Sequence, residues 1–142
     1  MKSAWMAAAA VLFAMAASSQ TPNAGQTPNA GKKENAGVNP TRLMDRAEVR
    51  VTRVEVAPGA VRTVHTHDDV KFHLFVPISG KLELTMGSAK PVDASPGTAF
   101  FMEKSTPHGF RNVGSAPAAV LEVFIKDGTA AQAKAIAAAL AR

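Results

Sequence analysis

Apolar and polar residues alternate with a period of two through most of the chain beyond residue 42, and Gly- or Pro-containing turns separate the alternating runs. A period of two places successive side chains on opposite faces of a β-strand. Many short strands at close spacing are typical of an all-β sandwich or barrel. The predicted strands occupy residues 49–56, 61–67, 70–78, 81–86, 91–94, 98–102, 108–113 and 118–125.

Two of these runs depart from simple alternation. In residues 49–56 the apolar positions change phase at Thr52 and Arg53, which predicts a bulge or a corner where the strand passes between two sheets. Residues 70–76 are apolar on both faces apart from Lys71 and His73, which predicts a central strand. Its outer face then needs a cover, either a second sheet or a second subunit, so we expect a homodimer.

The end of the chain has a helical pattern. Thr129 and Gln132 have the spacing of a capping box, alanines follow, and Ile136 and Leu140 lie four residues apart on one helix face. We therefore predict a short helix over residues 129–142 that packs on the barrel or on a partner subunit.

The first residues resemble a secretory signal, which we place at residues 1–19. Lys2 is the positive region, an apolar run follows, and Ala14-Met15-Ala16 fits the cleavage rule. An uncleaved anchor is the alternative, but the run is shorter than the roughly 20 residues that span a bilayer. The signal predicts a periplasmic or secreted protein with no stable membrane anchor after cleavage.

A six-residue repeat rich in Asn, Gly and Pro follows the signal, from residue 20 to residue 37. It contains no large apolar side chain that could offset the entropy of ordering it. We therefore predict a flexible linker over residues 20–41, a single barrel over residues 42–128, and the helix after it.

Composition narrows the chemistry. The 142 residues include no cysteine and no tyrosine, which excludes disulfides, thiolate catalysis and phenol acids. The net charge is +5, and removal of Lys2 with the signal leaves about +4. Because the basic residues are scattered along the chain, we expect no nucleic-acid partner.

The candidate chemistry lies in the histidines, which all fall between Gly59 and Asn112. They are His65, His67, His73 and His108. His65 and His67 are two residues apart and share one face of a strand. Two neighbouring imidazoles are unfavourable to bury unless a metal ion accepts their lone pairs. His73 and His108 join them only if a barrel brings distant strands together.

The spacing of these residues resembles the two motifs of the cupin family. The first motif, G-x5-H-x-H-x(3,4)-E-x6-G, is matched by Gly59, His65, His67, His73 and Gly80. The second, G-x5-P-x-G-x2-H-x3-N, is matched by Gly97, His108 and Asn112, with Glu103 and Ser105 at the Pro and Gly places. The resemblance covers residues 59–112. It implies a small double-stranded β-helix, or jelly roll, with a mononuclear metal held by His65, His67 and His108.

The chain departs from the family at the carboxylate ligand. His73 stands where the family has glutamate, after a spacer one residue longer than usual. The resemblance therefore implies a ligand at His73 by position, with a neutral all-imidazole site. The alternatives are that His73 lies beside a three-histidine site, or that Asp68 or Asp69 replaces the glutamate. The ligands are compatible with Fe, Zn, Mn, Ni, Cu or Co.

These observations predict an exported cupin that binds a divalent transition metal and a small-molecule ligand or substrate. Dioxygenase-like oxidation is the first enzymatic hypothesis that the resemblance implies. The alternatives are a non-catalytic periplasmic module that binds a small ligand or the metal, and a metal-free structural cupin. Glu103 and Arg62 are candidate residues at the rim for acid–base work or anion contact.

Overall fold

The computed structural model describes residues 35–141. These residues form two antiparallel sheets, in the strand orders β1-β2-β9-β4-β7 and β3-β8-β5-β6, with one helix near the C-terminus. The prediction of an all-β fold with a short C-terminal helix is confirmed. The elements are β1 (Val38–Asp45), β2 (Val49–Val56), β3 (Val61–His65), β4 (Phe72–Ser79), β5 (Leu82–Met86), β6 (Val92–Ala94), β7 (Phe100–Glu103), β8 (His108–Asn112), β9 (Ala118–Ile125) and α1 (Ala130–Leu140).

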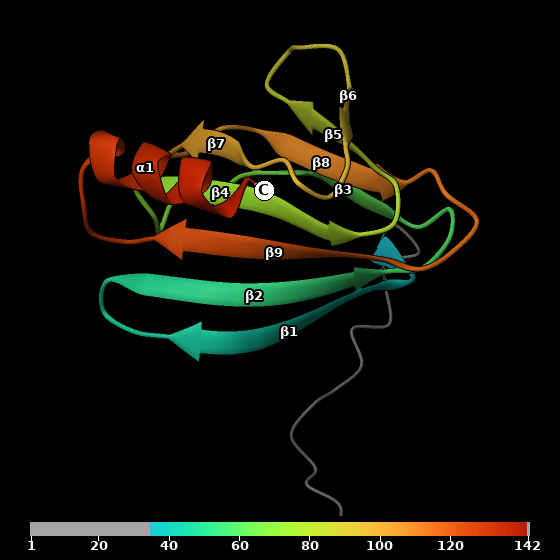
Figure 1. Ribbon diagram of the computed structural model, residues 1–142, viewed down its shortest axis with the longest axis horizontal. Coiled ribbons are helices and arrows are strands. Elements are labelled where there is room, and N and C mark those ends of the chain that lie inside the picture. Colours follow the sequence, from blue (N-terminus) through green and yellow to red (C-terminus); the bar gives the residue numbers. More distant parts are fainter. Residues whose placement is uncertain (1–34, 142) are drawn as a thin grey trace, which may run out of the picture. The chain divides into compact units, whose positions relative to one another are not determined.

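The core lies between the two sheets, which face each other in Figure 1. Alternate residues of each strand point inward, as the two-residue period requires. The five-stranded sheet contributes Val56, Phe75 and Val120, and the four-stranded sheet contributes Leu82 and Leu84, all of them fully buried. This apolar filling occupies one part of the interior and leaves the histidines at another.

Helix α1 covers the outer face of β4, with β7 beside it (Figure 1). Ala133 and Ala137 of the helix pack with Leu74 and Val76 of β4, so the helix itself buries the face for which a second sheet or subunit was expected. The prediction that a second sheet or subunit covers this face is therefore wrong. The small alanine side chains let the helix approach the sheet closely, so this contact needs no stripe of large apolar residues on the helix. The predicted capping box is confirmed, with Thr129 as the N-cap and Gln132 as its partner.

Strand β2 is continuous, so the bulge or corner predicted within it is wrong. It pairs with β9 without a register shift from Val49 to Val56. The phase change arises because Val54 and Val56 face the core, whereas Val49 and Val51 alternate on the outer face and are only half-buried. The bulge occurs instead in the neighbouring strand β1, between Arg42 and Met44.

Strand β1 begins at Val38, before the predicted start of the barrel at residue 42. The boundary was misplaced because every side chain of this edge strand from Asn39 to Asp45 is exposed, and backbone pairing with β2 holds the strand without an apolar pattern. The predicted signal and residues 20–34 of the predicted linker lie outside the described residues. In residues 35–141 no helix is long and apolar enough to cross a membrane.

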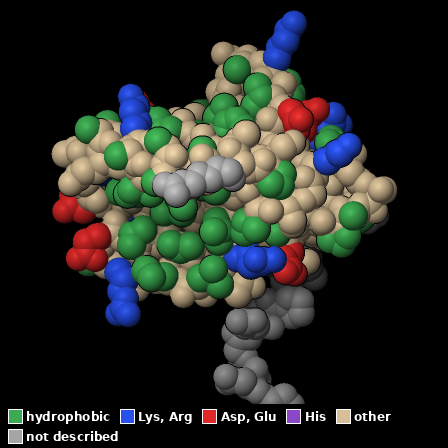
Figure 2. Space-filling view, viewed as in Figure 1, with side chains coloured by type: hydrophobic (Ala, Val, Ile, Leu, Met, Phe, Trp, Pro, Cys, Tyr) green, Lys and Arg blue, Asp and Glu red, His purple; other side chains and the backbone are tan. Residues whose placement is uncertain are grey.

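The outer face of the five-stranded sheet has an apolar surface beside α1. Figure 2 shows apolar side chains gathered there, over β9 and β2. Met44 of β1, which pairs with Val51 on this face, is 45% exposed, and Ile136 of α1 is 43% exposed. The helix therefore buries only part of this face.

Candidate metal centre

Three neighbouring segments bring the four histidines together. His65 ends β3 and pairs directly with His108, the first residue of β8. His67 follows β3 in the loop that leads to β4, and His73 is the second residue of β4. The ring centroids of His65, His67 and His108 are 4.4 to 5.2 Å apart. The predicted convergence of the histidines is therefore seen in the structure.

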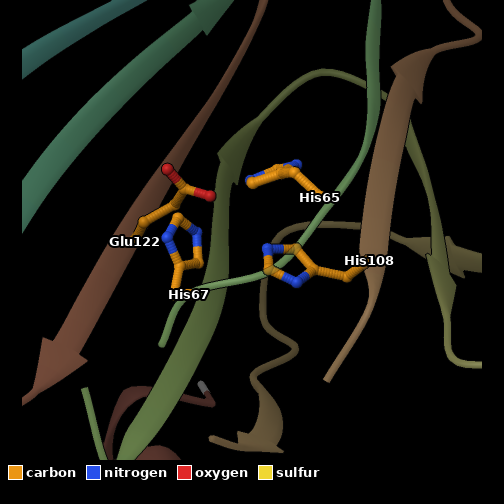
Figure 3. Close-up of side chains that lie close together, drawn as sticks. All are labelled: His65, His67, His108 and Glu122. Carbon is orange, nitrogen blue, oxygen red and sulfur yellow. The ribbon is translucent and has the colours of Figure 1, made fainter. Parts of the chain in front are cut away.

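A carboxylate completes this group. One ligand atom from each of His65, His67, His108 and Glu122 lies within 4.8 Å of the other three, and Figure 3 shows these side chains facing one another. Glu122 comes from the middle of β9, and its neighbours on the same face, Val120 and Phe124, are buried apolar residues. The structure thus contains three histidines and one glutamate that could hold a metal ion.

Glu122 is not among the site residues predicted from the sequence. The available signal was a single acidic residue within an otherwise apolar strand, residues 118–125. A buried carboxylate in such a position is rarely tolerated without a partner. In the paired strands, His73 lies opposite Phe124, and Phe75 lies opposite Glu122. The carboxylate is therefore one diagonal step away, on the neighbouring strand, from the place where the family motif has glutamate.

Backbone carbonyls orient two of the imidazoles. The Nδ1 atom of His65 lies 2.9 Å from the carbonyl oxygen of Thr63, and that of His108 lies 2.9 Å from the carbonyl oxygen of Thr106. A carbonyl can only accept, so each Nδ1 carries the proton and each Nε2 carries a free lone pair. This is the arrangement that metal-binding histidines commonly have.

Several buried polar atoms in the cluster lack any hydrogen-bond partner. They are the Nε2 atoms of His65, His67 and His108, both ring nitrogens of His73, and Oε1 of Glu122. Buried groups of this kind are normally paired, and each unpaired one is unfavourable. A cation at their centre would satisfy the lone pairs together, so the donor set fits a divalent metal.

The protonation states of the histidines also favour metal binding. Burial lowers the pKa of His67 and of His108 to about 4, and the neighbouring histidine charges act in the same direction. Burial also lowers the pKa values of His65 and His73. These shifts all favour the neutral rings, which can donate lone pairs. Burial raises the pKa of Glu122 to about 7, although the charges of Arg62 and Arg50 oppose the shift.

His73 lies beside the four-residue group but outside it. Its side chain is 3% exposed, its Nε2 is 3.6 Å from Oε1 of Glu122, and its ring stacks on Phe124 with the centroids 4.5 Å apart. The prediction that His73 is a metal ligand stays a prediction. Its position also agrees with the alternative of a residue next to a three-histidine site.

The other candidates have different partners. Asp69 binds Arg50 at 2.8 Å, and Asp68 accepts a hydrogen bond of 2.7 Å from the hydroxyl of Ser105. Neither aspartate belongs to the cluster, and Glu122 is the carboxylate that lies beside the histidines. Glu103 is exposed at the end of β7, and Arg62 is half-buried on β3.

A small depression beside the cluster has no space for a water-sized molecule. Larger hollows among the described residues, such as one of about 320 Å³ lined by Arg53, Glu55 and Ser79, contain no histidine. The depression is smaller than the usual range for drug-sized ligands. Its lining consists of His67, Val70, His73, Met102, Glu103, Ser105, Thr106 and His108.

Two facing antiparallel sheets, with a cluster of histidines and one glutamate that could hold a metal ion, define the double-stranded β-helix class of proteins. The family comparison makes the assignment specific, because the Cupin domain family matches residues 52–124, which is half of the chain. The chain belongs to the cupin family. No curated protein matches it in sequence.

Solved structures show the same fold at low sequence identity. TT1209 from Thermus thermophilus is 23% identical with a TM-score of 0.56, over 62% of this chain and 82% of that one. KdgF from Halomonas sp. is 22% identical with a TM-score of 0.58, over 65% and 81%. The DMSP lyase DddQ from Ruegeria pomeroyi DSS-3 is 18% identical with a TM-score of 0.61, over 72% and 55%.

Proposed function

We propose that this chain is an exported cupin that binds one divalent transition metal through His65, His67, His108 and Glu122, and that it acts on a small molecule at that site. The observation that supports this most directly is the convergence of the unpartnered Nε2 atoms with Oε1 of Glu122. Three neutral imidazoles and one carboxylate leave a divalent ion with a net positive charge, which favours an anionic or readily deprotonated ligand.

Dioxygenase-like oxidation is the proposed reaction class. A bound redox-active ion would supply Lewis acidity and electron transfer. The chain's own residues would position the ligand: Val70 and Met102 form apolar walls of the depression, and the neutral His73 ring in its lining has one N–H donor and one acceptor nitrogen. A structural relative carries the name of a lyase, so this fold supports enzyme chemistry in that protein.

The volume of the depression favours a second candidate, a non-catalytic module that binds the metal or a very small ligand. The depression beside the histidines has no space for a water-sized molecule, whereas pockets for drug-sized ligands usually measure about 300 Å³ or more. In such a module the buried histidines and Glu122 would simply hold the ion. Elemental analysis and oxygen uptake separate the two candidates.

The test begins with protein purified from the exported fraction, and N-terminal sequencing checks cleavage near residues 16–19. Elemental analysis is expected to find one metal ion per chain. Iron together with oxygen consumption that depends on a diketone, phenolic or thiol substrate supports the enzyme. Zinc with no turnover favours the binding module. If the protein is absent from the exported fraction, the predicted localisation is refuted.

Two pairs of variants test the ligands. His65→Ala and His108→Ala are each expected to abolish metal retention, and a retained metal in both would refute the site. Glu122→Gln and His73→Gln then separate the two candidates for the fourth ligand. We expect Glu122→Gln to lose the metal and His73→Gln to keep it, and the reverse result would identify His73 as the ligand.

A homodimer stays a prediction. The apolar surface beside α1, with Met44 and Ile136 exposed, supports an intermolecular contact, although the face of β4 no longer requires one. Light scattering is expected to give the mass of a dimer, and the mass of a single chain would contradict this.

A further inference from the structure

His67 is held differently from the other two histidines of the four-residue group. His65 and His108 each have an Nδ1 bonded to a backbone carbonyl, but within residues 35–141 no hydrogen bond reaches the ring of His67. The ring packs edge-on against Phe124, with the centroids 4.6 Å apart. His67 also lies in a loop rather than in a strand. Its position therefore depends on how that loop is held.

The loop between β7 and β8 holds it. The backbone N–H of Ser105 donates to the carbonyl of His67 at 3.2 Å, and the Ser105 hydroxyl donates to Oδ1 of Asp68 at 2.7 Å. One residue further on, the carbonyl of Thr106 accepts from Nδ1 of His108. The same short loop thus contacts the backbone beside His67 and the ring of His108.

Ser105 has an unfavourable backbone conformation at this point. Its φ is 59°, and it is the one non-glycine residue with positive φ among the described residues. It also stands at a glycine place of the second cupin motif. A side chain in this conformation is disfavoured relative to glycine, and a hydrogen bond from the Ser105 hydroxyl would offset that cost. The structure shows such a bond, from the Ser105 hydroxyl to Asp68.

We propose that Ser105 and Asp68 form a clasp that positions His67 for metal binding, and that the clasp replaces the carbonyl contact that His65 and His108 have. The inference rests on the proposed metal site. Ser105 and Asp68 are positioning residues, since neither contributes a ligand atom to the group. Partners of this kind typically change metal affinity by about 10- to 100-fold.

The test uses the full chain with Zn²⁺ in competition with a chromophoric chelator, and the melting temperature of the metal-free protein as a separate readout. Ser105→Ala and Asp68→Ala are expected to weaken Zn²⁺ binding by about 10-fold. Asp68→Asn keeps an acceptor oxygen and is expected to bind nearly as the wild type does. The absorption spectrum of bound Co²⁺ is expected to change in the two alanine variants but not in Asp68→Asn.

Ser105→Gly separates positioning from stability. Glycine relieves the positive φ, so the melting temperature of the metal-free protein should hold or rise, while Zn²⁺ affinity falls because the hydroxyl is lost. The matched control is Ser95→Ala, which removes a similar exposed contact of 3.0 Å to Asp93. This variant should leave Zn²⁺ affinity unchanged.

The outcomes distinguish the two proposals. A wild-type chain that binds no Zn²⁺ would overturn both the metal site and the clasp. If the wild-type chain binds Zn²⁺, and Ser105→Ala, Ser105→Gly and Ser95→Ala all bind it with the same affinity, the clasp alone is overturned. Parallel losses of affinity and melting temperature in Ser105→Gly would also overturn it, because they would show a purely structural role.

Discussion

Replacement of Glu122 by glutamine should stabilise the metal-free protein at alkaline pH. Glu122 is 7% exposed, its Oε1 has no partner, and burial raises its pKa from 4.5 to about 7. A carboxyl group whose pKa is raised on folding favours the neutral form in the folded state. Its contribution to stability is therefore greatest below pH 4.5 and is lost as the pH rises toward 7.

The magnitude follows from the two pKa values. Linkage gives a loss of stability of about 3 kcal/mol at pH 8 and of about 1 kcal/mol at pH 5, relative to a fully protonated group. The Glu122→Gln variant would lack this pH dependence, but its buried amide would lose about 1–2 kcal/mol at both pH values for want of partners. The variant should therefore gain about 1–2 kcal/mol at pH 8 and gain nothing at pH 5.

The assay is urea unfolding of chelator-treated protein at pH 5 and pH 8, with the change between the two pH values as the quantity of interest. Glu103→Gln is the control, because Glu103 is exposed and should show no such difference. With metal bound, the sign should invert, since Glu122→Gln removes a proposed ligand. If Glu122→Gln destabilised the metal-free protein equally at both pH values, the assignment of a buried, unpaired carboxylate would be refuted.

The remaining predictions test the framework around the site. Asn112→Ala should lower the free energy of unfolding by about 3 kcal/mol in urea titrations, because the buried amide donates to the carbonyls of Val56 and Ala116 and accepts from the N–H of Gly114. Wild-type stability in that variant would contradict the three bonds. Gly80→Ala should be destabilising by about 2 kcal/mol or more, since a Cβ there would lie 2.5 Å from the Cβ of Ala118 at a φ of 78°. Gly87→Ala is its control, with positive φ but open space, and should lose about 1 kcal/mol; equal losses in thermal melts would show that crowding is not the cause.

The sequence predicted most of the fold because strand alternation is a local signal. Residues 81–86 and 118–125 could be assigned without knowledge of their neighbours. The same signal failed in β1, where both faces are exposed, and it was misread in β2, where one half is apolar outward and the other half inward. Periodicity reports which face of a strand is apolar but not what lies against that face.

The histidines of the candidate site were identified from their spacing, and the sheets bring them together. Glu122 could not be identified in the same way, because its motif position is occupied by His73 and its own strand carries no second polar residue. The pairing of β4 with β9 places it one diagonal step from His73. Likewise, only the packing of α1 showed that Ala133 and Ala137 cover β4.

By itself, the sequence determined an all-β chain with a histidine cluster of cupin spacing, since period and spacing are properties of neighbouring residues. The tertiary structure alone decided which carboxylate faces the histidines, how Ser105 reaches Asp68, and what covers the central strand. These depend on contacts between residues far apart in the chain, such as His65 with His108 and Glu122. Their free energies are set by pairing and burial, which no local pattern records.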